Sequence, residues 1–221
     1  AVILRGGSEA FNTNKILVDL FKKALKAYKI DVNFVQFINS NNRKFVDYML
    51  SKMIDYIDVI IPRGGKDLVK KVQKISKVPT IGHLEGICHT YVDKDASIEM
   101  ARKVIYNAKL RNTSTCNATE TILLNKSIVK KFSNPILKKL EENNCIIYGD
   151  KFIKKIFKGK IYAAKEASWS TEYLSAKVSV KSVNDCDEAI KHINKYGTMH
   201  TDCIITKNNN TAKKFIKNVK S

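Results

Sequence analysis

The sequence has no apolar run long enough to span a bilayer and no closely spaced pair of cysteines. Its longest apolar stretches are short, such as residues 59–61, whereas a membrane-spanning helix needs about 20 apolar residues. The first residues show no basic segment followed by a long apolar stretch, so we expect no signal peptide. These absences argue against a membrane-spanning protein and favour a compact protein of the cytoplasm.

The five cysteines are too far apart for a C-x-x-C zinc knuckle, and we expect no metal site. Their odd number fits a reducing compartment better than a disulfide framework. Cys145 and Cys203 lie in apolar, strand-like runs, where a free cysteine usually packs as a small hydrophobic residue. Cys116 differs because it lies in a polar, hydroxyl-rich turn between a helical pattern and a strand pattern. A substrate can reach such a thiol, so Cys116 is the candidate nucleophile, with packing as its alternative role.

Acidic residues are few, since 21 aspartates and glutamates face 40 lysines and arginines and leave a net charge of +19. Such an excess can favour nucleic acids, because lysine and arginine neutralise phosphates. The lysine pairs, however, recur mostly on the polar faces of expected helices, without an aromatic RNA-binding motif between them. The chain is also rich in Asn and Ile, which indicates a coding bias. A basic nucleic-acid-binding protein is therefore the weaker alternative.

Short apolar runs alternate with helical periodicity along most of the chain, which predicts an α/β fold with mostly parallel strands. We expect strands at residues 1–4, 32–38, 56–61, 78–81, 87–92, 119–124, 145–148, 161–164, 176–183 and 203–206. We expect helices at residues 13–28, 43–51, 67–75, 97–110, 128–142, 187–196 and 211–219. The boundary between two domains is expected near residues 82–86.

The chain has neither a G-x-G-x-x-G fingerprint nor a Walker A loop, but it has two Arg-Gly-Gly turns. One begins at Arg5 and the other at Arg63, and each follows an apolar strand pattern and precedes a helical pattern. Glycine lets the backbone approach a ligand closely, and arginine and a helix N-terminus both favour phosphate. Either turn alone is equally consistent with an ordinary tight turn, but together they indicate a phosphate-bearing cofactor. We expect both turns at the carboxyl edge of one parallel sheet, facing one cleft.

Residues 82–89 hold two histidines and a carboxylate, Glu85, near the expected boundary. His83 or His89 has the chemistry of a general acid or base, although a hydrogen-bonded structural histidine is the commoner outcome. A nucleophile–base pair of Cys88 and His89 is disfavoured, because adjacent residues of a strand point to opposite faces of the sheet.

Four motifs in this order resemble the glutamate-5-semialdehyde dehydrogenase family, whose members are also called gamma-glutamyl phosphate reductases. They are residues 1–7, 61–65, 86–93 and 114–121, and the similarity continues through residues 196–202. This family belongs to the aldehyde dehydrogenase superfamily. The resemblance implies an aldehyde dehydrogenase-like α/β fold. It would comprise a partial Rossmann-like NADP(H)-binding domain at residues 1–84 and an α/β catalytic domain at residues 85–221 that lacks its C-terminal part.

The resemblance also implies NADPH-dependent reduction of L-glutamyl 5-phosphate to L-glutamate 5-semialdehyde, with release of phosphate, in proline biosynthesis. Cys116 is implied to be the catalytic cysteine, which forms a thioester. The residues implied to bind NADPH/NADP are Arg5, Gly6, Gly7, Ser8, Glu9, Arg63, Gly64, Gly65 and Glu172. His83 and Asn117 are implied to contact the substrate, and His83 stands where hydrolytic members of the superfamily have a glutamate base. The implied protein partners are further copies of the chain and glutamate 5-kinase.

Two departures from the family bear on activity. Asn112 and Thr113 precede the Ser-Thr-Cys turn, where many relatives have Arg-Pro. Family members are also considerably longer, and their N-terminal region carries an asparagine of the oxyanion hole. We therefore expect this chain alone to be a weak or inactive catalyst. The alternative to an active reductase is a catalytically inactive fragment or an interaction module that keeps the fold.

Overall fold

A computed structural model of the chain describes residues 1–40, 42–82 and 84–221. The chain forms two compact units, Ala1–Gly82 and His83–Ser221. The boundary follows Gly82, whereas the sequence prediction placed it after Leu84. The assignment of NADP(H) binding to the first unit and catalysis to the second stays a prediction. No helix in the described ranges is long and apolar enough to cross a membrane.

The second unit is built on a six-stranded sheet of parallel strands in the order β6-β5-β7-β4-β3-β8. Its strands are β3 (Cys88–Val92), β4 (Thr119–Asn125), β5 (Ile146–Gly149), β6 (Tyr162–Ala163), β7 (Lys177–Val183) and β8 (Asp202–Ile205). Its helices are α4 (Ile98–Leu110), α5 (Val129–Glu141), α6 (Lys151–Ile156), α7 (Cys186–Tyr196) and α8 (Asn209–Asn218), with a 3-10 helix at Glu166–Ser170. Because the strands are parallel, every segment that leads into a strand reaches the sheet at the same, amino end.

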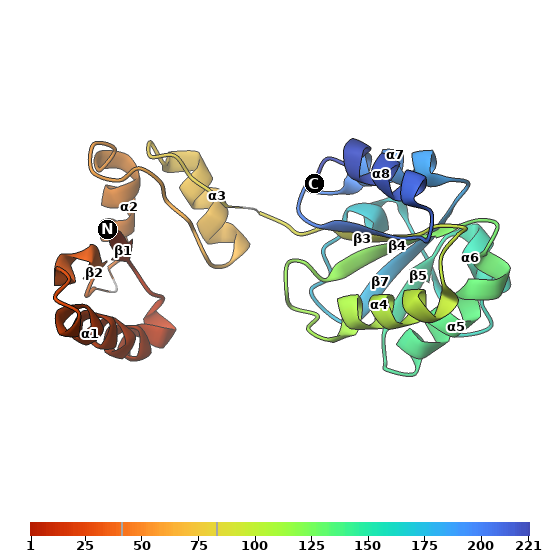
Figure 1. Ribbon diagram of the computed structural model, residues 1–221, viewed down its shortest axis with the longest axis horizontal. Helices are drawn as coiled ribbons and strands as arrows, with labels where there is room; N and C mark the ends of the chain where they lie inside the picture. The colour runs from red at the N-terminus through yellow and green to blue at the C-terminus, as the bar shows by residue number, and fades with distance from the viewer. Residues whose placement is uncertain (41, 83) are drawn as a thin grey trace. The chain divides into compact units, whose positions relative to one another are not determined.

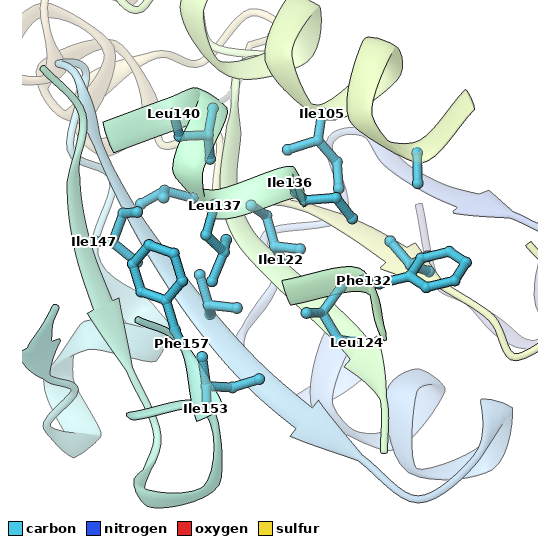
Figure 2. Packing of buried hydrophobic residues seen from close by; sticks show 14 of the residues in the cluster. Ile105, Ile122, Leu124, Phe132, Ile136, Leu137, Leu140, Ile147, Ile153 and Phe157 are labelled. Atoms are coloured by element: carbon cyan, nitrogen blue, oxygen red, sulfur yellow. The ribbon is translucent and has the colours of Figure 1, made fainter. Parts of the chain in front are cut away.

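Helices cover both faces of this sheet, with α4 and α5 on one face and α7 and α8 on the other (Figure 1). Along β3 the side chains alternate, so that Val92 joins the cluster under α4 and α5 while Tyr91 joins the cluster under α7 and α8. The larger cluster has Ile122 of β4 and Leu137 of α5 near its centre (Figure 2). Helix α5 buries residues 129, 132, 133, 136, 137 and 140, which is the spacing of one helix face.

The first unit contains β1 (Val2–Leu4) and β2 (Val35–Phe37), a parallel pair joined through α1 (Phe11–Ala27). Helices α2 (Arg43–Lys52) and α3 (Lys66–Ile75) follow. The core of this unit is small. Its fully buried apolar residues, among those described, are Val18, Leu50, Val69, Val72 and Val78.

The predicted α/β fold with parallel strands is confirmed, and it is clearest in the second unit. There the expected strands and helices are present, with ends shifted by one or two residues. Helix α6 was not expected, because it is short and rich in lysine. Its start is fixed by Asp150, whose side chain accepts a hydrogen bond of 2.7 Å from the backbone N–H of Ile153. In the first unit, the strands predicted at residues 56–61 and 78–81 are reduced to an isolated bridge between Ile60 and Thr80.

Candidate functional site

Cys116 lies in the connection from α4 to β4, at the amino end of the sheet. The turn is held by its own polar groups. Asn112 Oδ1 accepts a hydrogen bond of 3.2 Å from the N–H of Ser114, and Thr115 Oγ1 donates one of 2.9 Å to the Asn112 carbonyl. The Thr115 carbonyl accepts from the N–H of Ala118 at 3.0 Å, just before β4 begins. These local hydrogen bonds hold the backbone in a turn before β4 begins, and the Cys116 side chain is half-buried there.

The segment at residues 86–88 packs against the backbone of Cys116. A Cβ atom on Gly86 would collide with the Cys116 carbonyl oxygen, so only glycine fits at this position. The Cys88 thiol donates a hydrogen bond to the same carbonyl over 3.3 Å. The Ile87 N–H donates to Thr198 Oγ1 at 3.0 Å, which ties this segment to the one that leads into β8. The cysteine turn is thus fixed by residues distant in sequence.

The other four cysteines have thiols that ionise less readily than a free thiol. Burial raises the pKa of Cys88 to about 12 and the pKa values of Cys145 and Cys186 to about 11, and it also raises the pKa of Cys203. The thiolate, not the thiol, is the nucleophile, so these four cysteines react poorly near neutral pH. The chemistry of the five thiols therefore favours Cys116 as the reactive one.

The carboxylate of Glu172 reaches this junction from the segment that leads into β7. Its Oε1 accepts a hydrogen bond of 2.8 Å from the N–H of Gly86, the residue that abuts Cys116. The structure therefore places a candidate cofactor residue, Glu172, near the candidate nucleophile, Cys116, because both contact Gly86. The sequence prediction gave Gly86 no role, because nothing in the local pattern shows which backbone it touches.

A buried ion pair joins the two elements that flank the cysteine turn. Lys109 Nζ of α4 lies 2.6 Å from Glu120 Oε2 of β4, and the two side chains are 0% and 1% exposed. Burial raises the pKa of the Glu120 carboxyl, and the neighbouring Lys109 ammonium opposes that shift. Nothing in the sequence indicates this pair, because a helix end and a strand meet here across a turn without any regular spacing.

His89 has the environment of a structural histidine. Its Nδ1 lies 2.9 Å from Asp202 Oδ1, which also accepts a hydrogen bond of 2.8 Å from the His89 N–H. The ring of His192, on α7, meets His89 edge-on, with 5.5 Å between centroids. Burial lowers the pKa of His192 to about 3, so its ring is neutral at physiological pH. His89 therefore joins β3 to β8 on the α7 face of the sheet.

In the first unit, both Arg-Gly-Gly turns line one cleft of about 1050 Å³. The predicted cofactor residues that line it are Arg5, Gly7, Ser8, Glu9, Arg63, Gly64 and Gly65. Gly6 is not one of the lining residues. The two turns do not follow strands of one sheet in the described part of the unit, because β1 pairs with β2 and Ile60 forms only a bridge to Thr80. The expectation of a shared sheet edge was wrong, and the expectation of a shared cleft was right.

The two predicted substrate residues differ in what the structure shows. Asn117 is exposed on the cysteine turn, next to Cys116. His83 lies outside the described residues, so its role stays a prediction. Within the described ranges, no group of three or more His, Cys, Asp or Glu side chains is placed to hold a metal ion.

No protein-family model matches the chain. A gamma-glutamyl phosphate reductase of Thermodesulfovibrio yellowstonii is 43% identical over 221 residues, which are 100% of this chain and 52% of that protein. The crystal structure of the gamma-glutamyl phosphate reductase of Thermotoga maritima matches with a TM-score of 0.90 at 37% identity, over 100% of this chain and 53% of that one. A propionaldehyde dehydrogenase of Clostridium phytofermentans, 18% identical, shares the fold with a TM-score of 0.73 over 100% of this chain and 58% of its own. The chain spans about half the length of the curated relatives it matches. Its sequence is thus similar to about half of a gamma-glutamyl phosphate reductase, and its fold is aldehyde dehydrogenase-like.

Proposed function

We propose that this chain carries the cysteine chemistry of a gamma-glutamyl phosphate reductase, the NADPH-dependent reduction of L-glutamyl 5-phosphate to L-glutamate 5-semialdehyde in proline biosynthesis. The observation that carries the proposal is the place of Cys116. Its thiol is half-buried in a polar turn at the amino end of the sheet, while burial raises the pKa of the other four thiols. Assembly with further copies of the chain and contact with glutamate 5-kinase stay predictions.

The Cys116 thiolate attacks the acyl carbon of L-glutamyl 5-phosphate. The bond between that carbon and the phosphate oxygen breaks, phosphate leaves with the electron pair, and a thioester to Cys116 remains. NADPH, when bound, supplies the hydride that reduces this thioester to the aldehyde level. The electron pair of the carbon–sulfur bond then returns to Cys116 as the aldehyde is released.

Residues around the turn keep the sulfur in place during these steps. The Cys88 thiol and Gly86 fix the Cys116 carbonyl, so the backbone of the nucleophile does not depend on bound substrate. Glu172, held at Gly86, has the chemistry to orient the cofactor, because a carboxylate accepts hydrogen bonds from ribose hydroxyls.

The cleft of the first unit fits a dinucleotide with phosphate groups. Arg5 and Arg63 line it, and guanidinium groups bind phosphate through paired hydrogen bonds. Helix α3 begins at Lys66, directly after the second Arg-Gly-Gly turn, so the positive end of its dipole adds to the positive potential of that turn. These residues would bind the phosphates of the cofactor.

The proposal is tested by the reverse reaction, in which L-glutamate 5-semialdehyde and phosphate reduce NADP. We expect Cys116→Ala to abolish NADP reduction and Cys203→Ala, the other half-buried thiol, to retain it. Mass spectrometry after treatment with an acyl phosphate gives a second measure, with the acyl group expected on Cys116. Turnover by Cys116→Ala, or acylation of a different cysteine, would contradict the proposal.

A further inference from the structure

Glu120 connects the strand that follows the candidate nucleophile to the segment that carries Glu172. One carboxylate oxygen, Oε2, pairs with Lys109 Nζ at 2.6 Å. The other oxygen, Oε1, accepts a hydrogen bond of 3.2 Å from the backbone N–H of Leu174. Both oxygens of a buried carboxylate are thus engaged, one by α4 and one by the segment that leads into β7.

The backbone conformation at Leu174 is one that needs support from neighbouring groups, such as the hydrogen bond to Glu120. Leu174 has a φ of 47°, in the left-handed region that a leucine adopts only when its surroundings impose it. Leu174 is 40% exposed, so burial of the leucine does not impose this conformation. Lys109 Nζ also lies 6.0 Å from the ring centre of Tyr173, which stacks on Tyr148 of β5. The Lys109–Glu120 pair therefore contacts both residues that follow Glu172.

We propose that Glu120, oriented by Lys109, is a positioning residue that holds Glu172 at Gly86 beside the cysteine turn. This inference rests on the proposed function, in which Glu172 orients the cofactor. The Glu172 carboxylate accepts the Gly86 N–H at 2.8 Å, and Gly86 abuts the Cys116 carbonyl. Release of the Leu174 backbone would move Glu172 away from this junction while the local hydrogen bonds of the cysteine turn stay intact.

Two double variants separate positioning from the effect of buried charge. Removal of one partner of a buried ion pair leaves an uncompensated charge, whereas removal of both is often tolerated. Lys109→Met with Glu120→Gln removes both charges but keeps an amide oxygen that can accept the Leu174 N–H. Lys109→Met with Glu120→Leu removes the charges and the acceptor, with a side chain of similar size. The two double variants therefore differ mainly in whether residue 120 can accept the hydrogen bond from the Leu174 N–H.

The first measurement is amide hydrogen exchange in the 221-residue chain. We expect the Gly86 amide to exchange about tenfold faster in the Glu120→Leu double than in the Glu120→Gln double, the effect of losing one hydrogen bond. Gly86 is the informative amide, because neither double changes its own hydrogen-bond partner. Equal protection of Gly86 in the two doubles overturns the inference, whether or not the chain shows turnover.

The second measurement is the dependence of turnover on NADPH. We expect the KM for NADPH to rise about tenfold in the Glu120→Leu double, with kcat and the alkylation rate of Cys116 nearly unchanged. The Glu120→Gln double should keep the wild-type KM. Ile193→Ala, which removes packing on the α7 face, controls for stability and should leave KM unchanged. Failure of an acyl phosphate to acylate Cys116 of the wild-type chain counts against the proposed function, and the exchange of Gly86 then decides the positioning role alone.

Discussion

The two units of the chain differ in how deeply they bury their apolar residues. In the second unit the sheet is covered on both faces, and Ile122 and Leu137 are fully enclosed. In the first unit Leu50 is buried to a similar degree, but Leu20 and Phe21 on α1 are more than half exposed. Buried apolar area contributes about 25 cal/mol per Å² to stability. We therefore expect the second unit, which carries the thiol site, to be the more stable one.

The two units also differ in which residue types they contain. All five cysteines, all four histidines and the single tryptophan occur from residue 83 onward. The first unit contributes arginines, glycines and a cleft. Thiol, histidine and tryptophan probes therefore report on the second unit alone, and the two units can be tested separately.

The largest expected difference is in thiol reactivity within the second unit. With iodoacetamide on the native chain, mass spectrometry should find Cys116 modified first. Burial raises the pKa of Cys88 from 9.0 to about 12, which lowers its thiolate fraction about 10³-fold. Cys116→Ala should show no fast-reacting thiol until denaturant is added. Equally fast labelling of Cys203 in that variant would show that burial in this unit does not control reactivity.

Cavity formation compares the two cores directly. Leu137→Ala should destabilise the second unit by about 3 to 5 kcal/mol, because a fully enclosed site relaxes little around the lost atoms. Leu50→Ala should destabilise the first unit by about 2 to 3 kcal/mol, because a thin core can close over the gap. Urea unfolding followed by Trp169 fluorescence should register the first variant and not the second. A shift of the Trp169 transition by Leu50→Ala would mean that the units unfold together.

The next effect is a pH dependence confined to the second unit. Burial lowers the pKa of His192 from 6.5 to about 3, so the unfolded chain binds the proton that the folded chain rejects. This contribution to stability is complete above pH 6.5 and is lost as the pH falls toward 3. Between pH 7 and pH 5 the loss is about 2 kcal/mol, at 1.4 kcal/mol per pH unit.

His192→Gln provides the control, because its amide oxygen can still accept a hydrogen bond from Lys181 Nζ, which lies 3.1 Å from His192 Nδ1. We expect this variant to lose most of the difference in urea midpoint between pH 7 and pH 5. An unchanged pH dependence would assign the titration to another group.

The two units also differ in how well the sequence predicted them. Strands and helices of the second unit were found because each buries a regular face, as α5 does. Cys116 was predicted as the candidate nucleophile because its turn is polar over several consecutive residues. The apolar run at residues 56–61 predicted a strand. Such a run indicates only a tendency of these residues to form a strand, because a strand also needs a neighbouring strand with which to pair.

The contacts of the site could not be predicted in the same way. Gly86 meets Glu172 across 86 positions of sequence, and Lys109 meets Glu120 across a turn. Both contacts follow from the order and register of the parallel strands, such as Cys88 beside Thr119, and register is set by packing of the whole unit. The local sequence predicts the candidate nucleophile, whereas the order and register of the strands determine which residues surround it.

The smallest expected effect is a gain in stability of the first unit. Lys29 lies just past the end of α1 with a φ of 57°, and the next residue, Ile30, donates its N–H to the Leu25 carbonyl at 2.9 Å. Glycine is favoured at this position of a helix end because it has no Cβ to strain. Lys29→Gly should therefore slow amide exchange along α1 by an amount equal to about 0.5 to 1 kcal/mol, and Lys29→Ala should not. The Trp169 transition should stay where it is in both variants. Stabilisation of both units by Lys29→Gly would show that the two units do not unfold independently.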